Sequence, residues 1–182
     1  MAEFTGKVVV STGAGGHVAK AMAKLFAENG ALVVCGFDIS DDALAGFEGI
    51  VAAAGVQSRS FPCDLRDWDA LKDGMDRIAA EFGQIDILVN SATARTDPVW
   101  KGIEECNHEE VTQLMEVGPI GILGAMNAAF PHMKEHGGKI INFGSGGGRT
   151  PAVGLGAYSV SKAAVHSVTK SAAREWGKHK IN

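Results

Sequence analysis

The stretch Lys7-Val8-Val9-Val10-Ser11-Thr12-Gly13-Ala14-Gly15-Gly16-His17 decides the fold. Its first five residues form a short, continuous apolar run, which is typical of a strand buried on both faces of a parallel sheet. Apolar residues then recur at helical spacing: Val18, Ala21, Met22, Leu25 and Phe26. Glycines allow positive φ and a close approach to a ligand, and a helix N-terminus offers free N–H groups to a phosphate. The stretch predicts a strand, a glycine turn and a helix.

The rest of the chain repeats this alternation. Further strands are expected at 31–37, 58–63, 85–90 and 139–143, and further helices at 41–54, 67–82, 109–133 and 157–178. The alternation predicts an α/β fold with a doubly wound parallel sheet between two helical layers. The strand at 58–63 is the weakest and is expected at an edge. Gly118-Pro119 is expected to kink the long helix, and Ile181-Asn182 resembles the start of another strand.

Bulk properties exclude several classes of protein. The 182 residues are 46% hydrophobic and 21% charged, which suits one soluble globular domain over 1–182. The net charge is −4 with no basic stripe, so nucleic acid is not expected as a partner. No apolar run approaches the length of a membrane span.

The cysteines and histidines give no metal site. The three cysteines show neither disulfide nor zinc spacing, and Cys35 and Cys63 are expected to be small buried residues. A reducing, cytoplasmic location follows as an expectation. His132 and His136 are four residues apart, but no acidic or cysteine ligand accompanies them, so we predict surface histidines and no metal.

Asp38 follows the second strand, about 20 residues after the glycine turn. A carboxylate there can accept hydrogen bonds from a ribose diol and would repel a 2′-phosphate. No Arg or Lys lies beside it in the sequence, so NAD(H) is favoured over NADP(H). Alternatively Asp38 belongs with Ser40, Asp41 and Asp42 to the cap of the next helix. Both roles are compatible, because Ser40 or Asp41 can cap while Asp38 binds.

The catalytic candidates lie in the stretch Gly156-Ala157-Tyr158-Ser159-Val160-Ser161-Lys162. Residues four apart share one helix face, and a cation beside a phenol favours the phenolate. Tyr158 and Lys162 are therefore candidates for proton transfer. Ser145 follows the fifth strand and can face this pair across a cleft. The spacing alone is a weak signal, because most such pairs lie on a partly exposed helix with a solvated lysine.

In order along the chain, these motifs resemble those of the short-chain dehydrogenase/reductase family. Thr12-Gly13 opens the family's TGxxxGxG turn, Asp64-Leu65 resembles its adenine-contacting pair, and Asn90-Ser91-Ala92-Thr93 stands where the family has Asn-Asn-Ala-Gly. Ser145, Tyr158 and Lys162 match the catalytic serine, tyrosine and lysine. The resemblance implies a Rossmann fold that binds NAD(P) through the following residues: Gly13, Gly15, Gly16, His17, Val18, Asp38, Asp64, Leu65, Asn90, Ala92, Tyr158 and Lys162.

The chain departs from the family pattern at several positions. His17 and Ala19 replace the later glycines of the turn, and Thr93 replaces the last glycine of the fourth-strand motif. Gly118 stands where the family usually has an asparagine that helps to hold a water, so the triad is carried over and the tetrad is not. Family members usually continue through two more strands and a substrate-covering helix, so we expect this chain to lack that C-terminal part.

The resemblance implies hydride transfer between NAD(H) and an alcohol or ketone, with Tyr158 as acid and base. Lys162 would assist Tyr158 and bind the nicotinamide ribose, and Ser145 would hold the substrate oxygen. Residues 93–107 and 146–156 are expected to line a pocket for a small, neutral or apolar substrate, in a homodimer or homotetramer. The alternative hypothesis is a dinucleotide-binding or scaffold protein with degraded catalysis, which His17, Gly118 and the shorter chain favour.

Overall fold

A five-stranded parallel sheet forms the centre of the computed structural model, which describes residues 3–94 and 100–182. The strand order is β3-β2-β1-β4-β5. The strands are β1 (Val8–Thr12), β2 (Val33–Asp38), β3 (Gln57–Pro62), β4 (Ile87–Asn90) and β5 (Lys139–Asn142). The chain therefore winds outward from β1 in one direction and then from β4 in the other. The carboxyl ends of β1 and β4 form the switch point where such sheets bind ligands.

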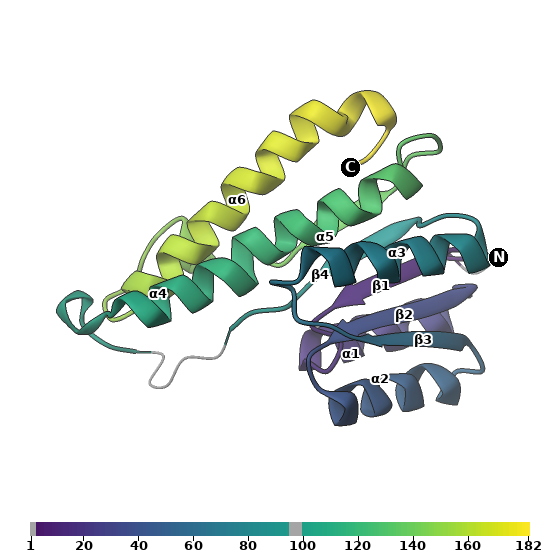
Figure 1. Ribbon diagram of the computed structural model, residues 1–182, viewed down its shortest axis with the longest axis horizontal. Helices are drawn as coiled ribbons and strands as arrows, with labels where there is room; N and C mark the ends of the chain where they lie inside the picture. The colour runs from purple at the N-terminus through teal and green to yellow at the C-terminus, as the bar shows by residue number, and fades with distance from the viewer. Residues whose placement is uncertain (1–2, 95–99) are drawn as a thin grey trace.

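Helices cover both faces of the sheet, so the predicted α/β/α layers are confirmed. On one face lie α1 (His17–Glu28) and α2 (Asp41–Ala53). On the other lie α3 (Trp68–Phe82), α5 (Gly121–Ala129) and α6 (Gly156–Trp176), with α4 (His108–Met115) leading into α5. Figure 1 shows α4, α5 and α6 running together beyond the edge of the sheet. Single-turn 3₁₀ helices complete the structure: η1 (Ile103–Glu105), η3 (Phe130–His132), η4 (Gly146–Gly148) and η5 (Gly177–His179).

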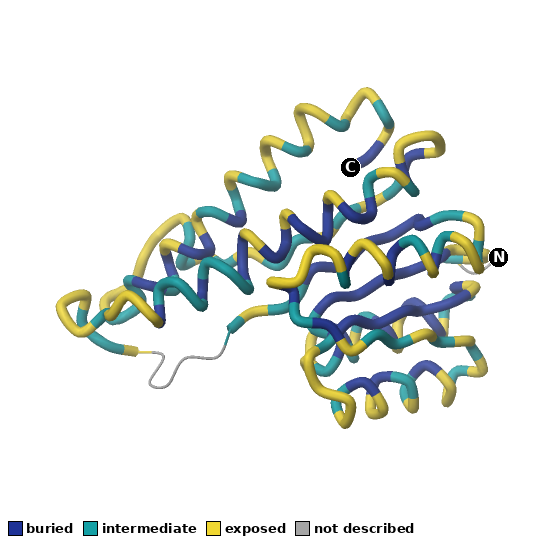
Figure 2. Tube along the Cα trace, in the orientation of Figure 1, coloured by how far each residue is buried: buried dark blue, intermediate teal, exposed yellow. Residues whose placement is uncertain are grey.

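Each helical layer has its own apolar core. Alternate residues of β1 point to opposite faces, so Val8 and Val10 belong to the α3/α5 core whereas Val9 belongs to the α1/α2 core. Figure 2 shows the central strands as buried along their length. In β3 every residue is intermediate or exposed, which agrees with its predicted place at the edge.

The expected break in the long helix is a π-helical turn, η2 (Glu116–Ile120), between α4 and α5. Gly118 has non-helical dihedrals there, with φ −76° and ψ −107°, and Pro119 supplies no N–H. The wider π-helical turn accommodates the residue without an N–H and the non-helical dihedrals of Gly118. The expected kink is therefore present, and α5 follows it and directs Ile122 and Ala125 into the core.

The end of the chain pairs with the sheet, as its sequence predicts. Ile181 forms an isolated parallel bridge with Gly138, and the Ile140 N–H donates to the Asn182 carbonyl at 2.8 Å. The expected loop at 93–107 contains η1 and a parallel bridge between Lys101 and Leu155. Its residues 95–99, with Pro98, lie outside the described residues.

The cysteines are free thiols, and the two in or beside strands are buried, as predicted. Burial raises the pKa of Cys35 to about 12 and that of Cys63 to about 11. Both are therefore neutral, unreactive groups at physiological pH. In the part of the chain that the structure describes, no helix has the length and hydropathy needed to cross a bilayer.

Candidate active site

The turn between β1 and α1 requires glycine at its first position. Gly13 has φ +66°, a left-handed conformation that side chains disfavour. A Cβ on Gly13 would also lie 2.6 Å from the Cα of Ala92 and 2.7 Å from its N, which is far inside van der Waals contact. The glycine turn therefore packs directly against the backbone that follows β4, and both line one edge of the sheet.

The N-terminus of α1 differs from those of the neighbouring helices in having no polar side chain to satisfy it. Side chains of Ser40, Asp67 and Asn107 cap α2, α3 and α4, and each of these helices has acidic residues in its first turn. Gly16 begins α1 without a side-chain cap, and the first turn has no acidic residue. The N–H groups and the positive dipole end of α1 are thus available to an anion such as a pyrophosphate.

Asp38 lies at the carboxyl end of β2, against the glycine turn. Its Oδ2 accepts a hydrogen bond from the Gly15 N–H at 2.8 Å, and its Oδ1 accepts one from the Ser40 N–H at 3.1 Å. Ser40, in turn, caps α2 by accepting from the Ala43 N–H. Capping is therefore the role of Ser40, and the Asp38 carboxylate borders the cleft.

A cleft of about 600 Å³ opens at this edge of the sheet. Seven of the predicted cofactor-binding residues line it: Gly13, Gly15, Gly16, Asp38, Asp64, Leu65 and Ala92. His17 and Val18 begin α1 with exposed side chains and do not line the cleft. The cleft also includes Arg66 and Val117, which the sequence did not single out. Its size and its position at the switch point suit a nucleotide.

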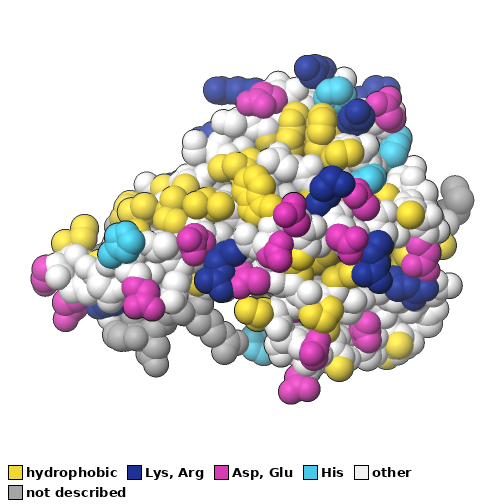
Figure 3. All heavy atoms as spheres, in the orientation of Figure 1, with side chains coloured by type: hydrophobic (Ala, Val, Ile, Leu, Met, Phe, Trp, Pro, Cys, Tyr) yellow, Lys and Arg dark blue, Asp and Glu magenta, His cyan; other side chains and the backbone are white. Residues whose placement is uncertain are grey.

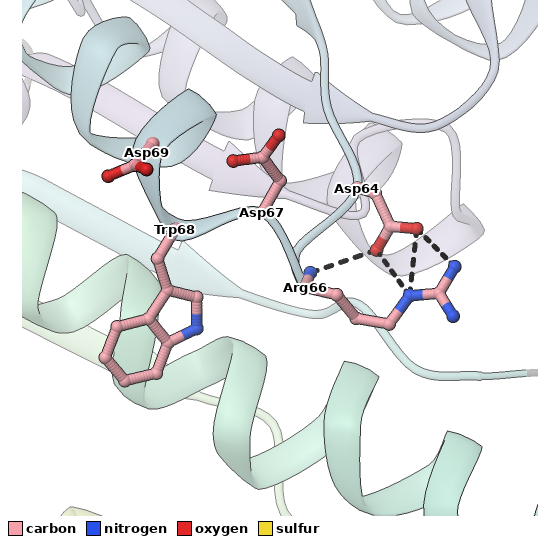
Figure 4. A pocket seen from close by; sticks show the side chains of 5 residues that line it. All are labelled: Asp64, Arg66, Asp67, Trp68 and Asp69. Atoms are coloured by element: carbon pink, nitrogen blue, oxygen red, sulfur yellow. Dashed lines mark hydrogen bonds and ion pairs between the residues drawn. The ribbon is translucent and has the colours of Figure 1, made fainter.

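Arg66 brings a positive charge into this cleft. Its Nε lies 3.0 and 2.9 Å from the two carboxylate oxygens of Asp64, and its Nη2 lies 2.5 Å from Oδ2. These hydrogen bonds hold the pKa of Asp64 below its usual range. Figure 4 shows the two side chains facing each other beside Asp67, Trp68 and Asp69, which line an adjoining hollow of about 490 Å³.

The sequence contained a usable signal for Arg66. Residues that follow neighbouring parallel strands meet at one edge, so a cation after β3 lies near the end of β2 although 28 positions separate Arg66 from Asp38. Sequence neighbours of Asp38 alone do not reveal it.

Asn90 occupies a buried polar network rather than the open cleft. Its Oδ1 accepts from Thr12 Oγ1 at 3.1 Å, and its Nδ2 donates to Asn142 Oδ1 at 2.9 Å. Asn142 continues the network to Thr169 Oγ1 on α6 at 3.0 Å. Asn90 is fully buried, so its side chain ties β1, β4 and β5 together below the site. Its predicted contact with a cofactor remains a prediction.

Ser145 lies just beyond β5, at the start of η4. Its Oγ accepts a hydrogen bond from the Gly147 N–H at 3.1 Å, which leaves the hydroxyl hydrogen for another acceptor. A methyl group on Gly147 would lie 3.5 Å from Ser145 Oγ and 3.7 Å from Tyr158 Cε1. Both side chains therefore border the same small space beside Gly147.

Lys162 lies one helical turn after Tyr158 on α6, as the spacing predicts. It is 5% exposed, and its Nζ lies 5.8 Å from the centroid of the Tyr158 ring. The Nζ donates to the Phe143 carbonyl at 3.0 Å. Burial lowers the pKa of Lys162. Lys162 is therefore not the solvated surface lysine that is usual for a Tyr-x-x-x-Lys spacing. Its hydrogen bond to the Phe143 carbonyl fixes the backbone between β5 and Ser145.

Chemically, the arrangement joins three functions at the carboxyl edge. A hydroxyl donor, a phenol and a buried amine converge around η4 and the first turns of α6. The uncapped N-terminus of α1 and the cleft lie beyond Asn90, along the same carboxyl edge of the sheet. In residues 3–94 and 100–182, no group of three or more potential metal-ligating side chains gathers. His132, which the sequence offered with His136 as a possible ligand pair, lies with its Nε2 2.7 Å from Asp76 Oδ1.

Comparison with known proteins matches this geometry to one family. The sequence profile described as short chain dehydrogenase matches residues 7–182. The chain belongs to the short-chain dehydrogenase family. It is 34% identical to galactitol 2-dehydrogenase of Agrobacterium fabrum over 97% of this chain and 67% of the relative. It is 29% identical to 12alpha-hydroxysteroid dehydrogenase of a Clostridium species over 100% of this chain and 72% of the relative.

Among solved structures, NAD⁺-bound xylitol dehydrogenase superposes with a TM-score of 0.93 at 28% identity. The match covers 99% of this chain and 68% of that one. These matches confirm the doubly wound Rossmann fold that the resemblance implies.

Proposed function

We propose that the protein is an NAD(H)-dependent oxidoreductase that interconverts an alcohol and a ketone, with Tyr158 as the acid and base. The observation that carries the proposal is the burial of Lys162 beside the Tyr158 ring, with Ser145 bordering the same space. A lysine without a role in the site would be expected to extend its ammonium group into solvent, whereas Lys162 is buried. Relatives named as galactitol and hydroxysteroid dehydrogenases act on hydroxyl groups by their names, which supports the same class of substrate here.

Tyr158, Lys162 and Ser145 have different roles in proton transfer. Tyr158 takes the proton from the alcohol or returns it to the ketone oxygen. Lys162 stabilises the phenolate and binds the nicotinamide ribose with N–H groups that the Phe143 carbonyl does not use. The free hydroxyl hydrogen of Ser145 is donated to the substrate oxygen and stabilises charge on it. When bound, NAD(H) supplies or accepts the hydride.

The cofactor is held along the cleft. The uncapped N-terminus of α1 binds the pyrophosphate, and Leu65 and the Asp64–Arg66 pair border the adenine. Asp38 accepts from the ribose diol and disfavours a 2′-phosphate, which supports NAD(H) over NADP(H). The guanidinium of Arg66 is paired with Asp64, which offsets its attraction for a 2′-phosphate.

The assembly and the substrate pocket are proposed on the same basis. Residues 1–182 act as one dinucleotide-binding and catalytic domain. Figure 3 shows hydrophobic side chains gathered where α4, α5 and α6 run, and exposed residues there include Ile120, Leu123 and Val160. This surface supports a homo-oligomer through these helices. The bridge between Lys101 and Leu155 brings the two expected substrate loops together near Tyr158.

A second candidate is a dinucleotide-binding protein with little turnover. Position 118 favours it, because a Cβ there would lie 2.7 Å from Ser161 Oγ. Ser161 donates to the Leu114 carbonyl, so an asparagine could not be added at 118 without disturbing this contact. This chain therefore has no asparagine at position 118 to take part in a proton relay.

Turnover separates the two candidates. We expect the wild type to reduce NAD⁺ with at least one member of a panel of polyols, sterols and terpene alcohols. Tyr158→Phe should lower turnover by about 100-fold or more while NADH binding is retained. The control is Phe143→Tyr, which adds the same hydroxyl to a partly buried ring on the other face of the sheet, against the α1/α2 core. Normal turnover by Tyr158→Phe would refute the role of the phenol, and NADH binding without turnover on any alcohol would favour the second candidate.

A further inference from the structure

His166 lies one turn after Lys162 on α6, and its side chain contacts the backbone of Ser145. Its Nε2 is 3.0 Å from the Ser145 carbonyl oxygen. A carbonyl oxygen only accepts hydrogen bonds, so Nε2 carries the proton and donates. The imidazole is therefore fixed on the residue that is proposed to hold the substrate oxygen.

The two side chains bind two carbonyls, two residues apart, in the segment that links β5 to η4. Lys162 Nζ binds the Phe143 carbonyl and His166 Nε2 binds the Ser145 carbonyl. Ser145 itself is extended, with φ −154° and ψ 151°, and the Gly144 N–H donates to the Asn142 carbonyl at 3.0 Å, so the backbone turns at Phe143. Residues 162 and 166 also share one face of α6. The helix thus holds the segment from Phe143 to Ser145 at two points.

Gly144 allows this close approach. A Cβ on Gly144 would lie 2.8 Å from His166 Cε1, so the imidazole ring rests directly against the backbone between the two held carbonyls. The His166 ring is only half-buried, yet it lies so close to Gly144 that position 144 has no room for a side chain. This contact fixes where the ring lies as well as where its N–H points.

The Ser145 carbonyl and hydroxyl both bind N–H groups of η4, which begins just after Ser145. The carbonyl also accepts from the Gly148 N–H at 3.1 Å, and the hydroxyl oxygen accepts from the Gly147 N–H at 3.1 Å. Moving the Ser145 carbonyl therefore moves the turn that sets the direction of the Ser145 hydroxyl. We propose that His166 is a positioning residue that fixes the Ser145 hydroxyl relative to Tyr158 through the Ser145 backbone.

The proposal rests on the proposed oxidoreductase function, and paired variants test it. His166→Gln keeps an N–H donor near the position of Nε2, whereas His166→Met has similar length and no donor. We expect His166→Met to lower kcat about tenfold, equivalent to about 1.4 kcal/mol, with KM and the Kd for NADH unchanged. His166→Gln should restore most of kcat. His179→Gln, at a half-buried histidine packed on Phe130, is the matched control.

Equal kcat for His166→Met and the wild type would overturn the proposal. So would an equal loss in both His166 variants, because that would show a packing role without a hydrogen bond.

A second measurement needs no turnover, so it separates failure of this proposal from failure of the proposed function. Amide hydrogen exchange by NMR reports the Gly147 and Gly148 N–H groups, which bind the Ser145 hydroxyl and carbonyl oxygens. We expect faster exchange at both amides in His166→Met and near wild-type exchange in His166→Gln. Unchanged exchange at both amides in His166→Met would overturn the proposal, whether or not the wild type turns over an alcohol.

Discussion

Replacing Gly13 by alanine tests the glycine turn in a way that separates two physical effects. The left-handed backbone at φ +66° costs an L-residue about 1–2 kcal/mol. The new Cβ would also lie 2.6 Å from the Ala92 Cα, a backbone atom that cannot rotate away. Overpacking of this kind costs about 1–3 kcal/mol. Gly13→Ala should therefore lower the free energy of unfolding by about 2–5 kcal/mol, a large part of a typical domain's stability.

Two other glycines provide matched controls. Gly55 has φ +74°, and a methyl group added there would meet nothing within 4 Å, so Gly55→Ala carries the backbone cost alone. Gly49 lies inside α2 with an open environment and no positive φ, so Gly49→Ala should stabilise by up to about 1 kcal/mol. Urea denaturation followed by tryptophan fluorescence measures all three variants. The reasoning is refuted if Gly13→Ala costs no more than Gly55→Ala.

Three further substitutions test individual charges. Asp38→Ala should narrow the difference in Kd between NADH and NADPH by about tenfold, measured by fluorescence titration, and an unchanged ratio would remove Asp38 from cofactor choice. Asp76→Asn should cost less than about 1 kcal/mol in urea denaturation at pH 7. Hydrogen bonds from Lys72 and His132 lower the Asp76 pKa below 3.8, so this contribution is present above that value and is lost as the pH falls through the lowered pKa; a constant difference would contradict the pairing. Lys162→Met should abolish turnover yet keep the free energy of unfolding within about 1 kcal/mol of wild type. Burial lowers the Lys162 pKa, so its charged form costs stability at neutral pH and less as the pH approaches 10.5; a large loss of stability would assign Lys162 a structural role.

The elements of this fold follow from local sequence patterns. The apolar runs and helical spacings predict every strand and the main helices, because burial in a parallel sheet and one apolar helix face leave distinct periodicities. The weak run at 58–63 is indeed the edge strand β3. At Gly118-Pro119 the pattern predicts the kink, which is confirmed, but not its π-helical form, which depends on packing against α6 and Leu65.

The site is less readable from sequence because its contacts join distant segments. Arg66 enters the cleft only through the side-by-side arrangement of β2 and β3. Asn90 carries a family motif, yet its side chain is used by Thr12 and Asn142, a fact that depends on the register of three strands. The contact between His166 and the Ser145 carbonyl has no signature in either segment, because a backbone atom carries no residue identity.

The most direct test of the account is a titration of the wild-type protein with NADH and NADPH, followed by nicotinamide fluorescence. We expect saturable binding of NADH, because α1 has no side-chain cap and its N-cap residue, Gly16, lines the cleft. We also expect a Kd for NADPH about tenfold or more higher, because the Asp38 carboxylate borders the cleft and would repel a 2′-phosphate. Absence of NADH binding, or binding of NADPH as tight as that of NADH, would contradict it.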